Sequence, residues 1–359
     1  YSHAAIQPEC GLFKPDLEAH FAHMLKTYRH RNTGGWLFSV DDDGAALDRA
    51  NDFYTLAFVI FACAHYYRTG GDPHAKEIAG QTLSLIDTSF RYKDLPGFAE
   101  ALDEGLKPLP GTRRQNPHMH FLEACLFAYE TWKESKYLYM ADEVVRRFYD
   151  YFFQAEQSLF PEFYDDNLRP HPEKGHVLEP GHYFEWIWLL KKHAALKTHP
   201  QAHDAACKIL LAFAGAHGWD ERYGGIYDEI DIAGNVLKDT KRLWPFTEGL
   251  KAHVLMLDSG MDKDALKDRT GRMVRVFKDH YMDERGFWTE WLSRDLRATT
   301  DYMPGTTPYH VYFGIMESRE VLKARGPSVS MTGVLEAELY AARRTLSGWV
   351  RSIRKDLSR

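Results

Sequence analysis

A pattern that recurs about every 63 residues is the feature that most constrains the fold of this chain. Short segments of strand-turn character, most with a glycine, precede each long stretch with helical spacing. Their marker hydrophobic residues follow one another at steps of 62, 62, 66 and 61; these are Trp36, Phe98, Phe160, Ile226 and Phe287. The chain is therefore predicted to contain five similar structural units.

Prolines mark the expected starts of four long helices, about 20 residues after the markers. Pro117, Pro180, Pro245 and Pro308 are spaced by 63, 65 and 63 residues, and a step of 63 back from Pro117 leads to Tyr54. Proline suits the first helical position because its missing N–H would have no partner there and its φ is already helical. Five helix N-termini are thus predicted at a regular spacing of about 63 residues.

Each unit is predicted to contain a short hairpin, an inner helix and an outer helix. Apolar residues recur with helical spacing after each start, as in Leu122, Leu126 and Tyr129. A second amphipathic stretch follows, for example at 139–153 and 266–280. The glycine-rich segments before the helices have the character of strand turns.

An opening helix near 16–28 and a closing helix near 335–356 complete the chain and leave no stretch for a linker. We therefore predict a single domain over residues 1–359. Repeated helix pairs that close on themselves would give an all-α (α/α)6 toroid with short β-hairpins capping one end. The closing helix is expected to dock through an apolar face, with arginines on or near its other face: Arg343, Arg344, Arg351 and Arg354.

Composition excludes several partner classes. The net charge of −6 disfavours a general nucleic-acid binder, which needs a basic surface. The longest apolar run, 56–64, is shorter than the roughly 18 to 20 residues of a membrane span, and no signal-like stretch opens the chain. Four scattered cysteines predict reduced thiols and a cytoplasmic location. We expect a small-molecule partner, no nucleic acid and no membrane, and we leave a homo-oligomer open.

A toroid would bring the first turns of its inner helices to one end of a central cavity. Ionisable residues recur within about a turn and a half of the predicted starts: His120, His182, Glu185, Glu248 and His310. Imidazoles suit proton transfer near neutral pH, and helix N-termini favour a negatively charged species such as an enediolate. Aldose and ketose sugars interconvert through that species, so the predicted ligand is a sugar.

The other side chains near these starts have predicted supporting roles. Glu185 is expected to orient the ring of His182, and Glu248 and Asn116 are expected to hold sugar hydroxyls. The aromatic residues expected to stack on the sugar are Trp186, Trp244 and Tyr309.

Neither a metal nor a cofactor is predicted. His118 and His120 are two residues apart on a helix and point to different faces, so they cannot share one ion. His118 is assigned to packing or capping. The histidines without a repeat partner are expected to be structural: His65, His193 and His253.

Three sequence blocks, at 114–120, 179–186 and 242–245 with Glu248, resemble the N-acylglucosamine 2-epimerase superfamily. The resemblance extends over about 34–320. It implies an (α/α)6 barrel, no metal, and His182 and His310 as the catalytic pair. It also implies that four residues surround the substrate: His120, Glu185, Glu248 and Trp244. To these predicted binding residues we add Asn116, Arg242, Tyr54 and Trp186.

The first inner helix looks more like the D-mannose isomerase branch, because it reads Asp52-Phe53-Tyr54-Thr55 where many members carry an arginine. The predicted reaction is D-mannose to D-fructose. His182 would assist ring opening and proton movement between O1 and O2, and His310 would carry hydrogen from C2 to C1.

Several alternatives stay open at this level. A mannose-6-phosphate isomerase would need cations for the phosphate, which Arg113, Arg114, Lys241 and Arg242 could supply. A sulfoquinovose isomerase is a further alternative. An N-acylglucosamine or cellobiose 2-epimerase would use the same histidines. An inverting glycosidase on an α/α toroid would use Glu185 and Glu248 as acid and base. A non-catalytic sugar-binding protein is the remaining option.

Overall fold

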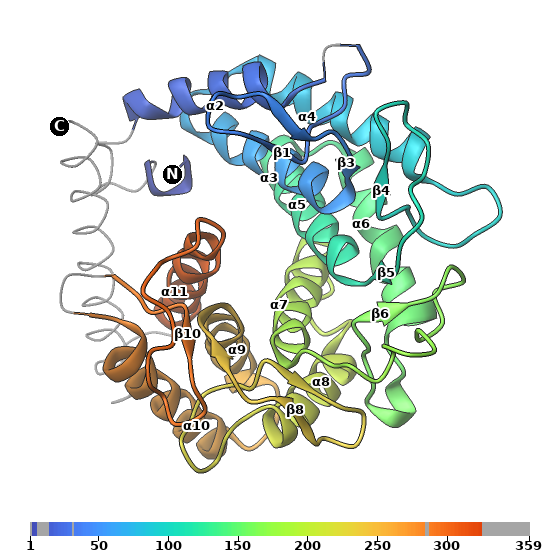
Figure 1. Cartoon of the computed structure of the whole chain (residues 1–359). Coiled ribbons are helices and arrows are strands. Elements are labelled where there is room, and N and C mark those ends of the chain that lie inside the picture. Colours follow the sequence, from blue (N-terminus) through green and yellow to red (C-terminus); the bar gives the residue numbers. More distant parts are fainter. Residues whose placement is uncertain (1, 6–13, 31, 284–286, 325–359) are drawn as a thin grey trace. The chain divides into compact units, whose positions relative to one another are not determined.

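The computed structural model describes residues 2–5, 14–30, 32–283 and 287–324, and long helices dominate them (Figure 1). Each inner helix begins within two residues of its predicted start, which confirms the predicted spacing of the helix starts. These helices are α3 (Phe53–Gly70), α5 (Asn116–Trp132), α7 (Pro180–Leu196), α9 (Leu243–Leu255) and α11 (Thr307–Ala324).

A second helix follows four of these inner helices. These outer helices are α4 (Pro73–Leu85), α6 (Ser135–Arg147), α8 (Asp204–His217) and α10 (Lys263–Val276). Three of them continue into a π-helical turn, namely η2 (Ile86–Phe90) after α4, η3 (Phe148–Phe152) after α6 and η6 (Phe277–Tyr281) after α10.

The remaining helical pieces are shorter or lie near the start of the chain. The predicted opening helix is α2 (Lys14–Tyr28), and α1 (Ser2–Ala5), η4 (Ala155–Gln157) and η5 (Met256–Asp258) are single turns. The predicted closing helix at 335–356 lies outside the described residues.

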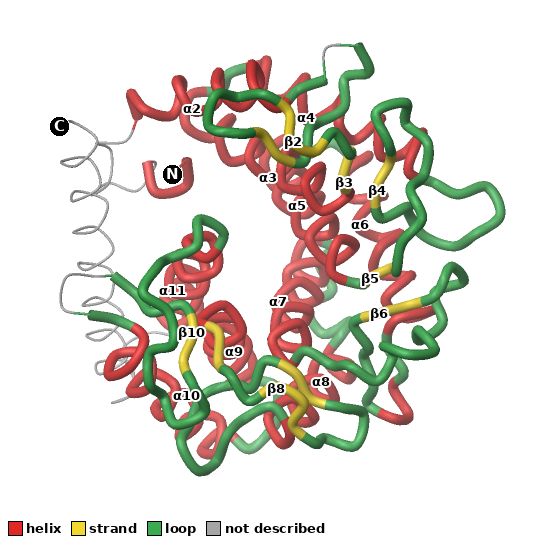
Figure 2. The backbone as a smooth tube through the Cα atoms, viewed as in Figure 1, coloured by secondary structure: helices red, strands yellow, loops and turns green. Residues whose placement is uncertain are grey.

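The strands are two or three residues long and pair antiparallel. Figure 2 shows them in yellow. Two pairs form local hairpins, β1 (Ser39–Val40) with β2 (Ala46–Asp48) and β7 (Glu229–Ile230) with β8 (Val236–Lys238). Three pairs join one repeat of the sequence to the next repeat: β3 (Asn51–Asp52) with β4 (Ala101–Leu102), β5 (Arg113–Arg114) with β6 (Phe163–Tyr164), and β9 (Lys241–Arg242) with β10 (Trp291–Leu292). Because β3, β5 and β9 lead directly into α3, α5 and α9, the strands gather at the N-terminal ends of these inner helices.

A five-residue hairpin tip occurs five times with the same hydrogen bonds. The backbone N–H of its first residue donates to the carbonyl of its fifth, over 2.8–2.9 Å. A side-chain oxygen of the first residue accepts from the N–H of the fifth. The first residues are 62, 62, 66 and 62 positions apart: Asp41, Asp103, Asp165, Asp231 and Ser293. The fourth residues have left-handed φ: Gly44, Leu106, Leu168, Gly234 and Leu296.

One marker of the repeat was predicted one residue too early. The equivalent β-bridges pair Arg29 with Trp36, Arg91 with Phe98, Trp219 with Ile226 and Met282 with Trp288. The fifth marker is therefore Trp288, which is buried, and not Phe287, which is half-buried. A shift of one residue matters because neighbouring residues of an extended segment point to opposite sides. With Trp288, the last step becomes 62 and matches the hairpin tips.

The chain divides into two compact units, each with its own packed interior. Unit 1 comprises Tyr1–Gln154, Pro161–His176 and Ala195–Thr198, and unit 2 comprises the rest of the chain. In unit 1, α3 packs against α4 and α5, and α5 packs against α6. In unit 2, α9 packs against α10 and α11. The single domain predicted over 1–359 stays a prediction, since each unit is described by itself.

Aromatic rings and free thiols fill the interior. Phe53 is completely buried and contacts the rings of Phe90, Phe98 and Phe121 at 5.1–5.7 Å between centroids. Burial of such rings supplies much of the free energy that stabilises a fold. The described cysteines are buried free thiols: Cys63, Cys125 and Cys207. Within the described ranges, the helices are too short or too polar to cross a membrane.

Candidate active site

Side chains from three inner helices of unit 2 meet at the indole of Trp244, which lies in the first turn of α9. The ring of His182, on α7, lies 4.9 Å from the indole between centroids, and the ring of His310, on α11, lies 5.3 Å from it. His182 and His310 are 4% and 9% exposed, whereas Trp244 is half-buried. The two histidines predicted to act as a pair thus contact one aromatic surface.

Gly181 allows Trp244 to approach α7 this closely. A Cβ added at Gly181 would lie 2.6 Å from the indole carbons, a distance that real Cβ atoms do not reach. On β9, directly before α9, the guanidinium of Arg242 lies 5.3 Å from the Trp244 ring centroid. A glycine on α7 and a cation on β9 therefore fix the position of the indole.

Arg242, predicted to bind substrate, is held by two carboxylates. Its Nε donates to Asp228 Oδ1 over 2.8 Å, and a terminal nitrogen donates to Glu179 Oε2 over 3.1 Å. The same Asp228 oxygen accepts from the Arg242 backbone N–H. These bonds make Arg242 a support for the start of α9 and for Trp244.

His310 belongs to a chain of three buried polar groups. Its Nδ1 lies 3.0 Å from Glu248 Oε1, and the other oxygen of Glu248 lies 2.6 Å from Lys251 Nζ. Burial opposes ionisation of Glu248, yet the charge of Lys251 and the bond from His310 outweigh it and lower the pKa of Glu248 to about 2. Because an ionised carboxylate only accepts hydrogen bonds, Nδ1 of His310 is the donor. The basic position of the neutral ring is then Nε2.

Glu185 lies close to this chain. One of its carboxylate oxygens is within 4.8 Å of the ligand atoms of Glu248 and His310. These donor types could hold a divalent ion. However, Lys251 already neutralises Glu248, which weakens that carboxylate as a ligand for a cation. The group fits proton handling better than metal binding.

In unit 1, the predicted binding residue His120 forms a second pair with a glutamate. Its Nδ1 lies 3.3 Å from Glu123 Oε2, and both residues are 3% exposed. The rings of Tyr54 and Phe58, from α3, lie 4.8 and 5.0 Å from the imidazole. Tyr54 and Asn116 are half-buried at the starts of α3 and α5.

His118 lies in the packing, where its sequence position suggested it would be. Nδ1 donates to the carbonyl of Arg114 over 3.2 Å, and Nε2 accepts from the N–H of Phe98 over 3.4 Å. Burial first, and then the nearby charge of Arg113, hold the pKa of His118 well below its ordinary value. The residue is a neutral link between the hairpin and α5.

The aromatic residues predicted to stack on substrate separate into two groups. Tyr309 is half-buried and its ring lies 4.6 Å from the His310 ring, which also lies 5.3 Å from the ring of Trp244. Trp186 is completely buried, with its ring edge-on to Phe160 at 5.9 Å. Trp244 and Tyr309 are therefore the aromatic residues beside His310, and Trp186 lies in the packing.

Sequence reasoning missed Glu123 and Lys251. Each follows a predicted site residue by three positions, His120 and Glu248 respectively. Residues three apart on a helix are neighbours on its surface, so the spacing carried the signal.

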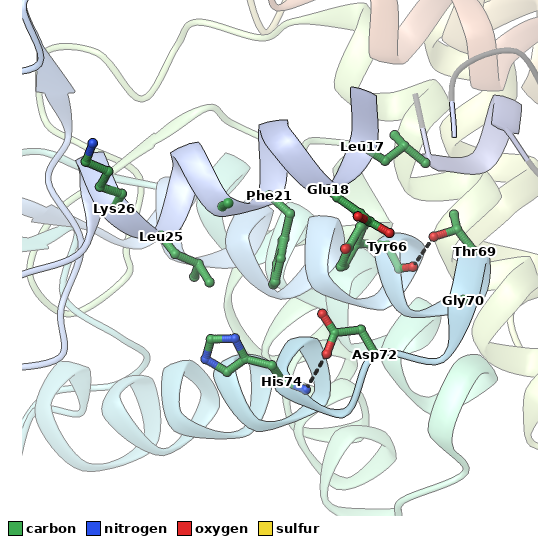
Figure 3. A pocket seen from close by; sticks show the side chains of 11 residues that line it. Leu17, Glu18, Phe21, Leu25, Lys26, Tyr66, Thr69, Gly70, Asp72 and His74 are labelled. Carbon is green, nitrogen blue, oxygen red and sulfur yellow. Dashed lines mark hydrogen bonds between the residues drawn. The ribbon is translucent and has the colours of Figure 1, made fainter. Parts of the chain in front are cut away.

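A cavity of about 700 Å³ lies in unit 1, between α2 and the end of α3 with the start of α4 (Figure 3). Leu17 and Phe21 of α2 and Tyr66 of α3 line it, with His74 beyond the helix cap Asp72. None of the predicted site residues lines this cavity. The candidate active site is therefore the group around Trp244 and His310.

Known proteins of similar sequence are sugar-converting enzymes. The chain is 31% identical over 292 residues to a mannose-6-phosphate isomerase of Rhizobium meliloti (strain 1021), covering 78% of this chain and 73% of that protein. It is 25% identical over 302 residues to a D-mannose isomerase of Thermobifida fusca, covering 77% and 72%.

A solved structure described as the crystal structure of D-mannose isomerase matches with a TM-score of 0.79. The match covers 90% of this chain and 83% of that chain at 22% identity, and it confirms the predicted all-α (α/α)6 fold class. The family model for N-acylglucosamine 2-epimerase (GlcNAc 2-epimerase) matches residues 4–314. With most of its length matched and its relatives named for isomerases, the chain belongs to the N-acylglucosamine 2-epimerase family and is a sugar isomerase or epimerase.

Proposed function

We propose that the chain interconverts D-mannose and D-fructose through a cis-enediolate. The observation that carries the proposal is the contact of His182 and His310 with one indole, with Glu248 fixing the orientation of His310. Two imidazoles beside an aromatic surface suit a sugar whose carbon-bound hydrogen must move. The proposed reaction needs no cofactor, because the substrate itself is oxidised at one carbon and reduced at the next.

His310 is the proposed base at carbon. Its Nε2 removes the proton from C2, and the electron pair of that bond forms the C1–C2 double bond of the enediolate. Glu248 stabilises the imidazolium through Nδ1. The Nε2 proton exchanges with solvent, and the ring then delivers a proton to C1. His182 assists ring opening and the passage of a proton from O2 to O1. Trp244 offers its face to the apolar side of the sugar.

A mannose-6-phosphate isomerase is the second candidate, because the relative at 31% identity carries that name. Phosphate recognition needs cations with free donors. In unit 1, Arg113 is 1% exposed and donates to the carbonyls of Phe98 and Asp166, and Arg114 pairs with Glu100.

The two cations of unit 2 are occupied as well. Lys241 is completely buried and donates to Asp220 Oδ2 over 2.9 Å and to the carbonyl of Arg294 over 2.7 Å. Arg242 is held by its two carboxylates. The four cations nominated for an anionic group thus have protein partners, which supports a neutral hexose and weighs against sulfoquinovose as well.

The glycosidase alternative has less support. Inverting glycosidases place their two carboxyl groups about 6.5 to 9.5 Å apart to admit a water molecule. Here ligand oxygens of Glu185 and Glu248 lie within 4.8 Å, and Lys251 keeps Glu248 ionised. A glutamate held in this way is a poor proton donor to a leaving group.

Incubation with D-mannose in deuterated water tests the proposal. We expect fructose labelled at C1, detected by NMR, and no label in the product mixture with His310→Asn. Glucose without fructose would overturn isomerisation in favour of epimerisation. Parallel assays with mannose 6-phosphate decide between the two candidates, and turnover of the phosphate ester alone would reject the neutral hexose.

A further inference from the structure

Lys251 is a buried cation placed directly behind the proposed base. It lies one turn after Glu248 on α9, is 3% exposed, and its Nζ is 2.6 Å from Glu248 Oε2. The same nitrogen lies 4.3 Å from the ring centroid of Trp188 and 3.6 Å from Glu317 Oε2. A buried ammonium costs free energy unless it is paired, so this position is defined by its partners.

The charges around His310 come from three helices of unit 2. Glu248 and Lys251 lie on α9, Glu317 lies on α11, and a Glu185 oxygen from α7 lies within 4.8 Å of the ligand atoms of Glu248 and His310. On the α10 side of α9, Arg269 faces a different imidazole, that of His253. Lys251 is thus a cation in direct contact with Glu248, the carboxylate that His310 bonds.

Electrostatics decides whether Lys251 favours or disfavours protonation of the His310 ring. A carboxylate beside an imidazole favours the imidazolium, which has no lone pair and cannot act as a base. A cation on the other oxygen of the same carboxylate offsets that tendency. Glu248 can then orient the ring through Nδ1 without holding it in the protonated form.

We propose that Lys251 is a positioning residue for the reaction, which keeps His310 in the neutral form by neutralising Glu248 through its second oxygen. The inference rests on the proposed role of His310 as the base at carbon. It adds a residue that touches neither substrate nor the reacting atoms and acts through Glu248. The three-member chain His310–Glu248–Lys251 then works as one unit.

The direct test is an NMR titration of the protein labelled with ¹⁵N-histidine, in which His310→Asn assigns the His310 signals. In Lys251→Met we expect the midpoint of the His310 ring titration to rise by about one pH unit. Lys251→Arg should retain the original midpoint. The matched control is Lys192→Met, because Lys192 lies 5.4 Å from the ring of the same Trp188. Equal midpoints in Lys251→Met and the control would overturn the proposal.

A second variant changes the charge in the opposite sense and leaves Lys251 in place. Glu317→Gln removes a carboxylate from the ammonium, so the His310 midpoint should fall, by about 0.3 unit for a partly exposed carboxylate 3.6 Å from the ammonium. If Lys251→Met does not fold, a rise or no change in Glu317→Gln overturns the proposal.

Activity supplies a separate readout. In Lys251→Met, the acid limb of the kcat/KM profile should move to higher pH together with the NMR midpoint, and activity should recover in alkaline buffer. A wild-type protein without isomerase activity would reject the proposed function, yet the NMR titration would still decide the role of Lys251.

Discussion

Two histidine–glutamate pairs, one in each unit, differ in what surrounds them. In unit 1, His120 pairs with Glu123 at 3.3 Å within one helix. In unit 2, His310 pairs with Glu248 at 3.0 Å between two helices. Both pairs are buried and both use Nδ1. The contrast is that Lys251 neutralises the second glutamate, while aromatic rings face both histidines.

Because of this difference, we expect the two pairs to have different roles in the reaction. A pair with a fixed counter-charge can gain and lose a proton on the ring while its carboxylate stays ionised. In unit 1, we expect the His120 ring, paired with Glu123, to donate or accept one hydrogen bond to a bound sugar. We therefore expect the unit 2 pair to act in the chemical step and the unit 1 pair to act in binding.

The largest expected effect is that of His310→Asn. The amide nitrogen can still donate to Glu248, but no base remains, so kcat should fall by about 10⁴-fold. Steady-state assays with D-mannose and deuterium exchange at C2 measure the loss. The paired variant His120→Asn should keep most of kcat, and equal losses in the two variants would contradict the expected difference in roles.

Glu248→Gln should have the next largest effect. The side chain keeps its shape and can accept from Nδ1, but it no longer stabilises the imidazolium, and kcat should fall by about 100-fold. Because Lys251 would lose its partner, circular dichroism and thermal unfolding must accompany the assay. A folded variant with undiminished kcat would show that the carboxylate charge is unimportant for the chemical step.

His120→Asn should act mainly on binding. Loss of one hydrogen bond to a sugar hydroxyl corresponds to about a tenfold increase in KM. We expect kcat to change by less than about threefold, since no proton of the chemical step passes through this ring. A large fall in kcat with constant KM would move His120 into the chemistry.

The smallest effect is expected for Glu123→Gln. A neutral amide replaces the carboxylate beside His120 and costs about twofold in KM. The matched comparison with Glu248→Gln is the sharpest form of the contrast, because the same atom change is made in both pairs. Comparable effects on kcat would argue that the two pairs are interchangeable.

The sequence predicted the elements well because their signals are local. Proline and helical apolar spacing placed the inner helices within two residues, and one marker was misread by a single position, Phe287 for Trp288. The site was harder to predict. Arg242 is a free cation in the sequence, but its partners Asp228 and Glu179 lie 14 and 63 residues away and only folding brings them to it.

Burial is the other quantity that the sequence does not contain. Trp186, the seventh residue of α7, is completely buried, whereas Trp244, the second residue of α9, is half-buried beside the imidazoles. The neighbours of each ring decide this, and they come from other helices. Lys251 and Glu123, in contrast, were within reach of a simple search for charged residues at i+3.

The repeated hairpin tips have a consequence for how such a protein can change. Each tip is closed by its own hydrogen bonds, and some strand bases are fastened separately to the next helix start, as Glu100 is to Arg114 and Asp228 is to Arg242. Leu106, Leu168 and Leu296 hold the left-handed conformation that favours glycine, at about 1 kcal/mol each. The exposed residues of a tip can therefore be changed without a change in the strand bases or in the groups around His310, whereas a buried tip residue such as Leu168 is held by its packing.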